Sequence, residues 1–347
     1  MIPVTRTKLS FTADGSWHDV DLSAYVDAGL TAGIMLIVIN TSVTEYGFGI
    51  RKNGSTDDFT SDVIEDTSHS WYATGIDGDN IVEVRADNSA VEFWLVAYMA
   101  SSEATFFTNS ISKDLSSSGV WEDIDVGAEA GSETPLVAFF ALVGGGYNLY
   151  EWGLRKNGST DDFTEDIYDG DTRGGFIGVD ENGKCEGFAD YHNYTHFELI
   201  GYLKANVSTL TNAVDYGASG AAAFEDVDFS DDLPAGSNGA LCLFFPANGL
   251  ELSFAVREKG ASYDSYYDAV KQQHVWVEVD SNMEAEQKVQ STYLGLWLWG
   301  YTQAAAAENM VALQKGFISG YHCFVNQFVR SRVAGLDPYK LPDGSKF

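Results

Sequence analysis

The stretch RKNGSTDDFT, residues 51–60, decides the fold of this chain, because it returns letter for letter at residues 155–164. A degraded third copy, REKGASYD, occupies residues 257–264. A repeat of this kind changes what every other motif in the chain means, so it takes precedence over them. Three copies at similar spacing indicate that one structural unit recurs along the chain.

Two further motifs accompany each copy in the same order. Before it stands an acid-alternating segment that begins with an aromatic residue: WHDVDL at 17–22, WEDIDV at 121–126 and FEDVDF at 224–229. After it stands an apolar segment that ends in tyrosine: FWLVAY at 93–98, FELIGY at 197–202 and LWLWGY at 296–301. These anchors predict three tandem domains over residues 1–103, 104–207 and 208–301, followed by a tail over 302–347.

The local period of the apolar residues is two. Val20 and Leu22 face one side of a strand while Asp19 and Asp21 face the other, as in a half-buried antiparallel strand. Units of about 100 residues with short alternating strands and no amphipathic helix are typical of β-sandwiches. We therefore expect an all-β fold of three tandem antiparallel, jelly-roll-like sandwiches arranged in series as a rod.

The repeated motif also contains a turn signal. Asn53-Gly54 and Asn157-Gly158 are the pair that a two-residue hairpin turn with positive φ angles prefers. Lys259-Gly260 is a poorer version in the third copy. The sequence thus predicts a tight hairpin at this point of each repeat.

Charge excludes several classes of function. The chain of 347 residues carries 51 Asp and Glu against 20 Lys and Arg, a formal net charge of −31. Such a protein is repelled by nucleic-acid phosphates and by anionic membranes, so neither is an expected partner. The longest apolar stretches, 34–39 and 136–143, are too short to span a bilayer. The first 20 residues lack the apolar core of a signal peptide, so none is expected.

No enzyme or cofactor is predicted. Nucleophile elbows, phosphate-binding loops, dinucleotide fingerprints and zinc-protease motifs are missing from the sequence. Cys185, Cys242 and Cys323 are odd in number and widely spaced, which favours buried thiols over disulfides or a zinc site. The 51 acidic residues make close carboxylate pairs by chance, so a pair carries no signal of hydrolysis.

Arg51, Arg155 and Arg257 recur in all three copies. They suit either a clamp for a carboxylate or sugar, or an internal ion pair with the motif or strand aspartates. We favour the internal role, because an element retained in every tandem copy more often builds the fold. The residues assigned this structural role are Arg51, Asn53, Gly54, Asp58, Arg155, Asn157, Gly158, Asp162, Arg257, Gly260 and Asp264.

Two acidic loops are the candidates for calcium. Asp77 and Asp79 flank a glycine, and so do Asp169 and Asp171. An EF-hand loop that began at Asp77 would need a glutamate at position 88, where Asn88 stands. Solvated turn acids are the favoured interpretation, and no metal is predicted.

Interaction surfaces are expected at two places. Copy three has Tyr263, Tyr266 and Tyr267 where the other copies are mostly polar, and tyrosine suits contact surfaces. The tail has five Lys and Arg against three Asp and Glu, a net charge of +2, which suggests docking onto a partner or onto the acidic body. The tail residues expected to make contacts are Phe317, Tyr321, Phe324 and Phe328, at helical spacing, with Arg330 and Arg332.

The aromatic-led Asp-[Val/Ile]-Asp strand, the RKNGSTDD motif and the closing Gly-Tyr strand together resemble β-sandwich modules in structural proteins of tailed bacteriophages and archaeal tailed viruses. The resemblance covers residues 1–301 and is strongest for copies one and two. It implies a capsid decoration or fibre-type protein on the virion surface, with other virion proteins as partners, no enzyme activity and self-association, often as a trimer.

Two alternatives stay open from the sequence. A cell-surface or secreted carbohydrate-binding adhesin would use Tyr266 or Tyr267 to bind a glycan, for example one on a host surface. A glycoside-cleaving depolymerase on a fibre would need an essential carboxylate pair and ranks last.

Overall fold

Alternating burial along short strands organises the described part of the chain. In β7 (Ile81–Ala86), β15 (Lys184–Ala189) and β23 (Glu284–Val289), every second side chain is buried. This is the period-two pattern of a strand with one face on a core. The same pattern at the same place in three repeats shows that the sequence repeat is also a structural one.

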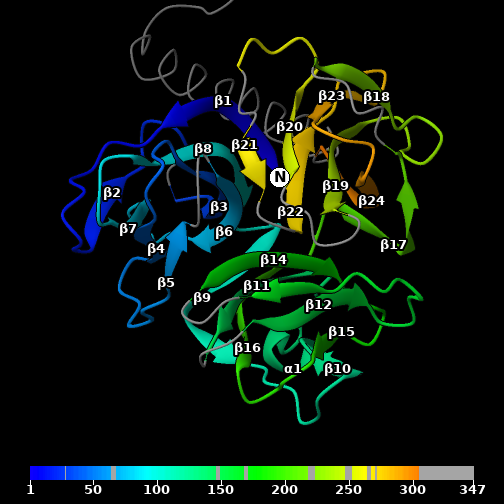
Figure 1. Ribbon diagram of the computed structural model, residues 1–347, viewed down its shortest axis with the longest axis horizontal. Coiled ribbons are helices and arrows are strands. Elements are labelled where there is room, and N and C mark those ends of the chain that lie inside the picture. The colour runs from blue at the N-terminus through cyan, green and yellow to red at the C-terminus, as the bar shows by residue number, and fades with distance from the viewer. Residues whose placement is uncertain are drawn as a thin grey trace, which may run out of the picture. The chain divides into compact units, whose positions relative to one another are not determined.

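The computed structural model describes residues 1–304 except 28, 64–67, 146–148, 168–170, 218–222, 247–251, 264–266 and 270–271, and except the side chains of 60–63 and 267–269. Its sheets are shown in Figure 1. We call residues 1–103, 104–207 and 208–301 repeats 1, 2 and 3.

Repeat 1 forms two antiparallel sheets. One has the order β1-β8-β3-β6, with bounds β1 (Ile2–Lys8), β8 (Val91–Ala100), β3 (Thr31–Asn40) and β6 (His69–Gly75). The other has the order β2-β7-β4-β5, with bounds β2 (His18–Asp21), β4 (Tyr46–Lys52) and β5 (Thr60–Val63) around β7.

Repeat 2 has the same two sheets. The first has the order β9-β16-β11-β14, with bounds β9 (Ala104–Ser112), β16 (Thr195–Leu203), β11 (Val137–Gly144) and β14 (Thr172–Gly178). The second has the order β10-β15-β12-β13, with bounds β10 (Val120–Asp125), β12 (Tyr150–Lys156) and β13 (Glu165–Ile167). The short helix α1 (Gly127–Ala130) follows β10. Within the described part of the chain, no helix has both the length and the apolar character needed to cross a membrane.

Repeat 3 also forms two antiparallel sheets. Its first sheet has the order β17-β24-β19-β22, with bounds β17 (Val207–Asp215), β24 (Leu294–Gln303), β19 (Ser237–Pro246) and β22 (Gln273–Glu278). Its second has the order β18-β23-β20-β21, with bounds β18 (Glu225–Asp228), β20 (Leu252–Glu258) and β21 (Tyr267–Ala269).

Strand order is therefore the same in all three repeats. Counted within a repeat, it is 1-8-3-6 in one sheet and 2-7-4-5 in the other, the order of an eight-stranded jelly roll. The predicted all-β, antiparallel fold is confirmed. The domain boundaries at 103, 207 and 301 stay a prediction.

The rod expected from the sequence is wrong. Residues Met1–Ala304 form one compact unit, and repeat 1 contacts repeat 3 as well as repeat 2. The side chain of Gln273 accepts a hydrogen bond from the Trp71 amide at 3.3 Å, and the Tyr72 hydroxyl donates to the Thr172 carbonyl at 2.7 Å. Strands β6, β14 and β22 thus meet one another, and apolar residues of all three repeats join one core cluster.

The predicted two-residue hairpin is also wrong. The turn at Asn53-Gly54 exists, with Gly54 at a φ of 79°, and Ser55 N–H donates to the Lys52 carbonyl at 3.0 Å. Asn53 is not among the residues with positive φ, so this is not the mirror-image turn that connects adjacent hairpin strands directly. The pairing of β4 with β5 begins only at Gly49 and Thr60. Residues 55–59 therefore lie outside the sheet, between the turn and β5.

Candidate functional site

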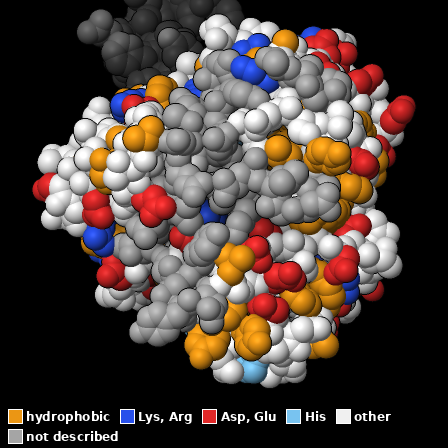
Figure 2. Space-filling model, viewed as in Figure 1, with side chains coloured by type: hydrophobic (Ala, Val, Ile, Leu, Met, Phe, Trp, Pro, Cys, Tyr) orange, Lys and Arg blue, Asp and Glu red, His pale blue; other side chains and the backbone are white. Residues whose placement is uncertain are grey.

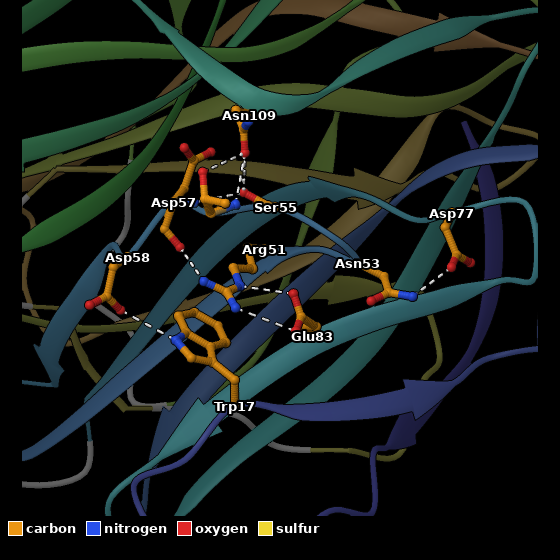
Figure 3. Close-up of polar contacts among 10 residues, drawn as sticks. Trp17, Arg51, Asn53, Ser55, Asp57, Asp58, Asp77, Glu83 and Asn109 are labelled. Atoms are coloured by element: carbon orange, nitrogen blue, oxygen red, sulfur yellow. Dashed lines mark hydrogen bonds and ion pairs between the residues drawn. The ribbon is translucent and has the colours of Figure 1, made fainter.

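The arginine of the repeated motif is held on three sides. Arg51 Nε donates to Glu83 Oε2 at 2.9 Å, and Nη1 donates to the Asp57 carbonyl at 2.6 Å. The guanidinium lies 4.0 Å from the centre of the Trp17 ring, a cation–π contact (Figure 3). The exposed fraction of both the Arg51 and Glu83 side chains is only 16%. A ligand carboxylate would have to displace Glu83.

The other repeats build the same arrangement. Arg155 pairs with Glu186 at 2.8 Å, donates to the Asp161 carbonyl at 2.9 Å and lies 4.2 Å from the Trp121 ring centre. In repeat 3, Arg257 pairs with Glu286 at 2.5 Å and lies 3.5 Å from the Phe224 ring centre. It also donates to the Tyr263 carbonyl at 2.7 Å.

The expected partners of these arginines need correction. Asp58 and Asp162 accept hydrogen bonds from the indole N–H groups of Trp17 and Trp121, at 3.3 and 3.0 Å, and Asp264 lies outside the described residues. The arginines pair instead with glutamates on the neighbouring strand. Register is the reason, because Arg51 stands directly opposite Glu83 across β4 and β7.

The backbone segment that Arg51 holds reaches into repeat 2. Asn109 Oδ1 on β9 accepts from Ser55 Oγ at 3.2 Å and from Thr56 N–H at 2.8 Å. In return, Asp57 Oδ2 accepts from the Ser110 amide at 2.7 Å. Figure 3 shows Ser55 and Asp57 pointing toward Asn109. We call this set of contacts, with the lysine described next, the clasp.

A lysine and a glycine complete the clasp. Lys52 Nζ donates to the Phe106 carbonyl of β9 at 2.9 Å, and burial lowers the pKa of Lys52. Gly75 at the end of β6 lies so close to β9 that an added Cβ would stand 2.7 Å from the Phe106 Cβ. The first repeat therefore grips the first strand of the second repeat.

The same clasp joins repeat 2 to repeat 3. Asn212 Oδ1 on β17 accepts from Ser159 Oγ at 3.0 Å and from Thr160 N–H at 2.8 Å. Asp161 Oδ2 accepts from the Ala213 amide at 2.8 Å. Lys156 Nζ, the counterpart of Lys52, donates to the carbonyl of Thr209 on β17 at 3.1 Å.

The sequence reasoning missed these contacts. Lys52, Ser55, Thr56 and Asp57 are identical in copies one and two but become Glu258, Ala261, Ser262 and Tyr263 in copy three. Residues that act only within one repeat should be retained in all three copies. The joint change of these four residues in the last copy therefore indicated that they contact the next repeat.

The junction from repeat 3 back to repeat 1 is different. Tyr263, predicted to belong to an interaction surface, faces repeat 1, because the Arg6 guanidinium lies 5.0 Å from its ring centre and 4.6 Å from that of Trp94. A groove of about 760 Å³ lies here, whereas the cavities at the first and second clasps measure about 40 and 20 Å³. Tyr266 and the side chain of Tyr267 lie outside the described residues.

In the first loop proposed for calcium, Asp77 uses its carboxylate oxygens for hydrogen bonds within the protein. Asp77 Oδ2 accepts from Asn53 at 2.6 Å, and its Oδ1 accepts from the Asp79 and Ile81 amides at 2.9 and 2.8 Å. Asn157 makes the same bond to Asp180, at 2.8 Å. These acids tie the motif turn to the turn before β7 or β15.

The prediction of solvated turn acids is wrong for the second loop proposed for calcium. Asp171 is not a solvated turn acid, because it is 2% exposed and forms a buried ion pair with Arg173 at 2.9 Å. Asp169 lies outside the described residues. Among the described residues, no three His, Cys, Asp or Glu side chains come together as a metal site.

Several titratable groups are buried. Burial raises the pKa of the Cys185 and Cys242 thiols, which are free and buried as expected, while Cys323 lies outside the described residues. Burial lowers the pKa of His69 to about 3 and that of His274 to about 4. The expected tail contacts also lie outside the described residues: Phe317, Tyr321, Phe324, Phe328, Arg330 and Arg332.

Comparisons with known proteins do not assign this chain to a family. No protein-family model matches the chain, and no curated protein matches it. One similar solved structure is described as Sulfolobus Turreted Icosahedral Virus; it shares 10% identity over 87% of this chain and 91% of its own, with a TM-score of 0.24. Another, described as a triple jelly roll fold and turret assembly in an archaeal virus, shares 10% identity over 86% and 90%, with a TM-score of 0.23. Likeness of this degree assigns neither a fold nor a function to this chain.

Proposed function

We propose that this chain is a structural protein of a virion, in which three jelly-roll domains serve as building material. The observation that carries the proposal is the pair of clasps, Lys52 to Asp57 and Lys156 to Asp161. The longest identical stretch in the chain is used to hold one repeat against the next. A repeated motif that joins one domain to the next suits a protein that serves as a structural component.

The chemistry of the recurring residues supports a non-enzymatic role without a cofactor. Each recurring arginine has its carboxylate, carbonyl and ring partners inside the protein. Binding a substrate carboxylate there would first break an ion pair that is already shielded from water. The resemblance to tailed-virus modules points to the same role, as a capsid decoration or fibre-type surface component.

The proposal extends to partners. Other virion proteins would bind the chain, which would self-associate, with a trimer as the form that the resemblance favours. The tail over 302–347, with its net charge of +2, would attach the protein to an anionic surface of the capsid or tail.

Truncation tests this role. A chain that ends at Ala304, just beyond β24, should unfold with the same midpoint as the full chain but fail to enter purified particles. The control is the full chain with Lys340→Ala, which keeps the length of the tail. Normal incorporation of the truncated chain would contradict the docking role, and a full chain found in no particle would contradict the virion role.

One surface favours a second candidate, the carbohydrate-binding adhesin. Tyr191 and Tyr194 are 56% and 43% exposed, and both rings contact the buried Tyr150 ring, at 5.5 and 5.0 Å between centres. Rings fixed in this way can stack on sugars. A glycan array on the full chain and on a Tyr191→Ala, Tyr194→Ala variant tests it, with Tyr293→Ala as the exposed control. Saturable binding that only the double variant loses would support the adhesin.

A further inference from the structure

The third junction presents a strand edge that the first two junctions cover. Strands β9 and β17 are edge strands of their sheets, and each receives a clasp. Strand β1 is the equivalent edge strand of repeat 1. Its residues Pro3, Val4 and Thr5 line the groove of about 760 Å³ instead. Edge strands are a common place for another peptide to add, although Pro3 itself has no N–H to donate.

Two replacements in repeat 3 distinguish the third junction from the first two. Glu258 stands at the position of Lys52 and Lys156, so the cation that reaches the next strand becomes an anion. Glu278 stands at the position of Gly75 and Gly178, as the pairing of β22 with β19 shows.

The second replacement acts by its bulk. An added Cβ would lie 2.7 Å from the Phe106 Cβ at Gly75 and 2.6 Å from the Thr209 Cβ at Gly178. A glutamate at the equivalent position therefore keeps β1 from approaching as closely as β9 and β17 do. The groove is the space that remains.

The carboxyl groups of Glu258 and Glu278 are neighbours inside the groove. Burial and the neighbouring Glu258 carboxylate, which is hydrogen-bonded to it, raise the pKa of Glu278 to about 7. Among the described residues, neither carboxylate has a cation within ion-pair distance. A lysine or arginine from outside would restore the cation that the first two junctions supply from within.

Aromatic rings also line the groove. Trp71, Trp94 and Tyr263 line it, with Arg6 between the rings of Trp94 and Tyr263. An extended peptide points alternate side chains to opposite sides. One set would meet these rings while the other set meets Glu258 and Glu278. The groove thus offers a strand edge, two neighbouring carboxyl groups and aromatic rings together.

From this geometry we propose that the groove between repeats 3 and 1 binds an extended peptide of a partner protein that carries alternating basic and apolar residues. The peptide adds to the edge of β1 and places its cations on Glu258 and Glu278. This site does not depend on the virion role, since it would serve any partner with such a segment.

Fluorescence anisotropy with the full chain tests the site. The probe is a labelled, end-blocked hexapeptide of alternating lysine and valine, and the same peptide with glutamate in place of lysine is the charge control. The lysine peptide should bind saturably and the glutamate peptide should not. No binding of the lysine peptide, or equal binding of both, would overturn the proposal.

Variants locate the binding. Glu258→Lys with Glu278→Gly gives the third junction the residues of the other two and should weaken binding at least about tenfold, the effect of about 1.4 kcal/mol. Asp79→Gly with Glu181→Lys makes the same charge change on exposed turns and should leave binding within about twofold. Equal losses in both variants would mean attraction by net charge alone and would overturn the site.

A milder variant guards against a folding defect. Glu258→Gln removes one charge without a change in size and should weaken binding about threefold or more, with an unchanged urea midpoint. Unchanged affinity would overturn the role of the carboxylate pair. The virion role would survive either failure, because the truncation at Ala304 tests it separately.

Discussion

The position of the recurring arginine in each repeat needs a side chain that can bind a carboxylate, a backbone carbonyl and an aromatic ring together, and a guanidinium meets all three needs. Arg155 must bind a carboxylate, a backbone carbonyl and an aromatic face at once, through Glu186, Asp161 and Trp121. Its planar fork has several donors in fixed directions and an aromatic-stacking face, whereas an ammonium is a point charge. The carbonyl contact has a second effect, because it fixes the segment that forms the clasp.

Replacing this arginine should therefore cost more than replacing a surface cation. We expect Arg155→Ala to lower the free energy of unfolding by about 2–3 kcal/mol, because it leaves Glu186 partly buried without its cation. Arg155→Lys should recover only part of the loss. Lys8→Ala breaks an ion pair whose lysine is 48% exposed and should cost at most about 1 kcal/mol. Urea unfolding measures all three, and equal costs would refute the argument.

Buried histidine gives the protein a pH dependence of known sign. The pKa of His274 falls to about 4 because burial among Trp152, Phe176 and Trp299 disfavours the imidazolium. The unfolded chain takes up this proton near pH 6.5, before the folded chain does. The contribution of His274 to stability is thus present above pH 6.5 and is lost as the pH falls toward 4.

The test compares urea unfolding at pH 7.5 and pH 5.0. Between these values, the wild-type chain should lose roughly 1–2 kcal/mol more than a His274→Phe variant, which keeps a ring but cannot bind the proton. His192→Gln, at a partly exposed position, should follow the wild type. An identical loss in the wild type and the His274→Phe variant would contradict the assignment.

At the scale of the strands, the sequence predicts what lies within a repeat better than what lies between repeats. Period-two patterns such as Val20 and Leu22 are local, so the strands and their antiparallel, all-β character follow from them. The ion-pair partner Glu83 was missed because it depends on register between β4 and β7, which no local pattern fixes. The contact of Gln273 with Trp71 spans 202 residues and has no sequence signature at all.

The close approach of strands at the clasps gives a prediction about glycine. In Gly178→Ala the new Cβ would stand 2.6 Å from the Thr209 Cβ, so β17 must move and the bond from Lys156 must lengthen. We expect a loss of about 1–3 kcal/mol, as for other overpacked sites. Gly75→Ala should behave alike at the first clasp.

Gly78→Ala is the control, because nothing lies within 4 Å of its Cβ position. Thermal unfolding should shift for Gly178→Ala and Gly75→Ala, and hardly for Gly78→Ala. If all three variants unfold together with the wild type, the strands at the clasps are not closely packed and the account of the third groove, which rests on the same contact, loses its basis.

For the whole molecule, charge opposes the compact state. Acidic side chains are distributed over the visible face, with few basic ones among them (Figure 2). With a formal net charge of −31, we expect repulsion between these acids to outweigh the exposed ion pairs, since each such pair stabilises by at most about 1 kcal/mol. Salt screens both effects, so the sign of the salt response shows which is larger.

Sodium chloride should therefore stabilise this protein. Between about 0.01 and 0.5 M the screening length falls from about 30 Å to well under 10 Å, which removes most repulsion between distant acids. We expect the urea midpoint to rise over this range. Neutralising exposed acids with Asp79→Asn, Glu181→Gln and Asp231→Asn should raise the low-salt midpoint and flatten the rise. A midpoint that fell with salt would mean that ion pairs such as Arg51–Glu83 outweigh the net charge, and the compact unit would then be held chiefly by electrostatic attraction rather than by its apolar core.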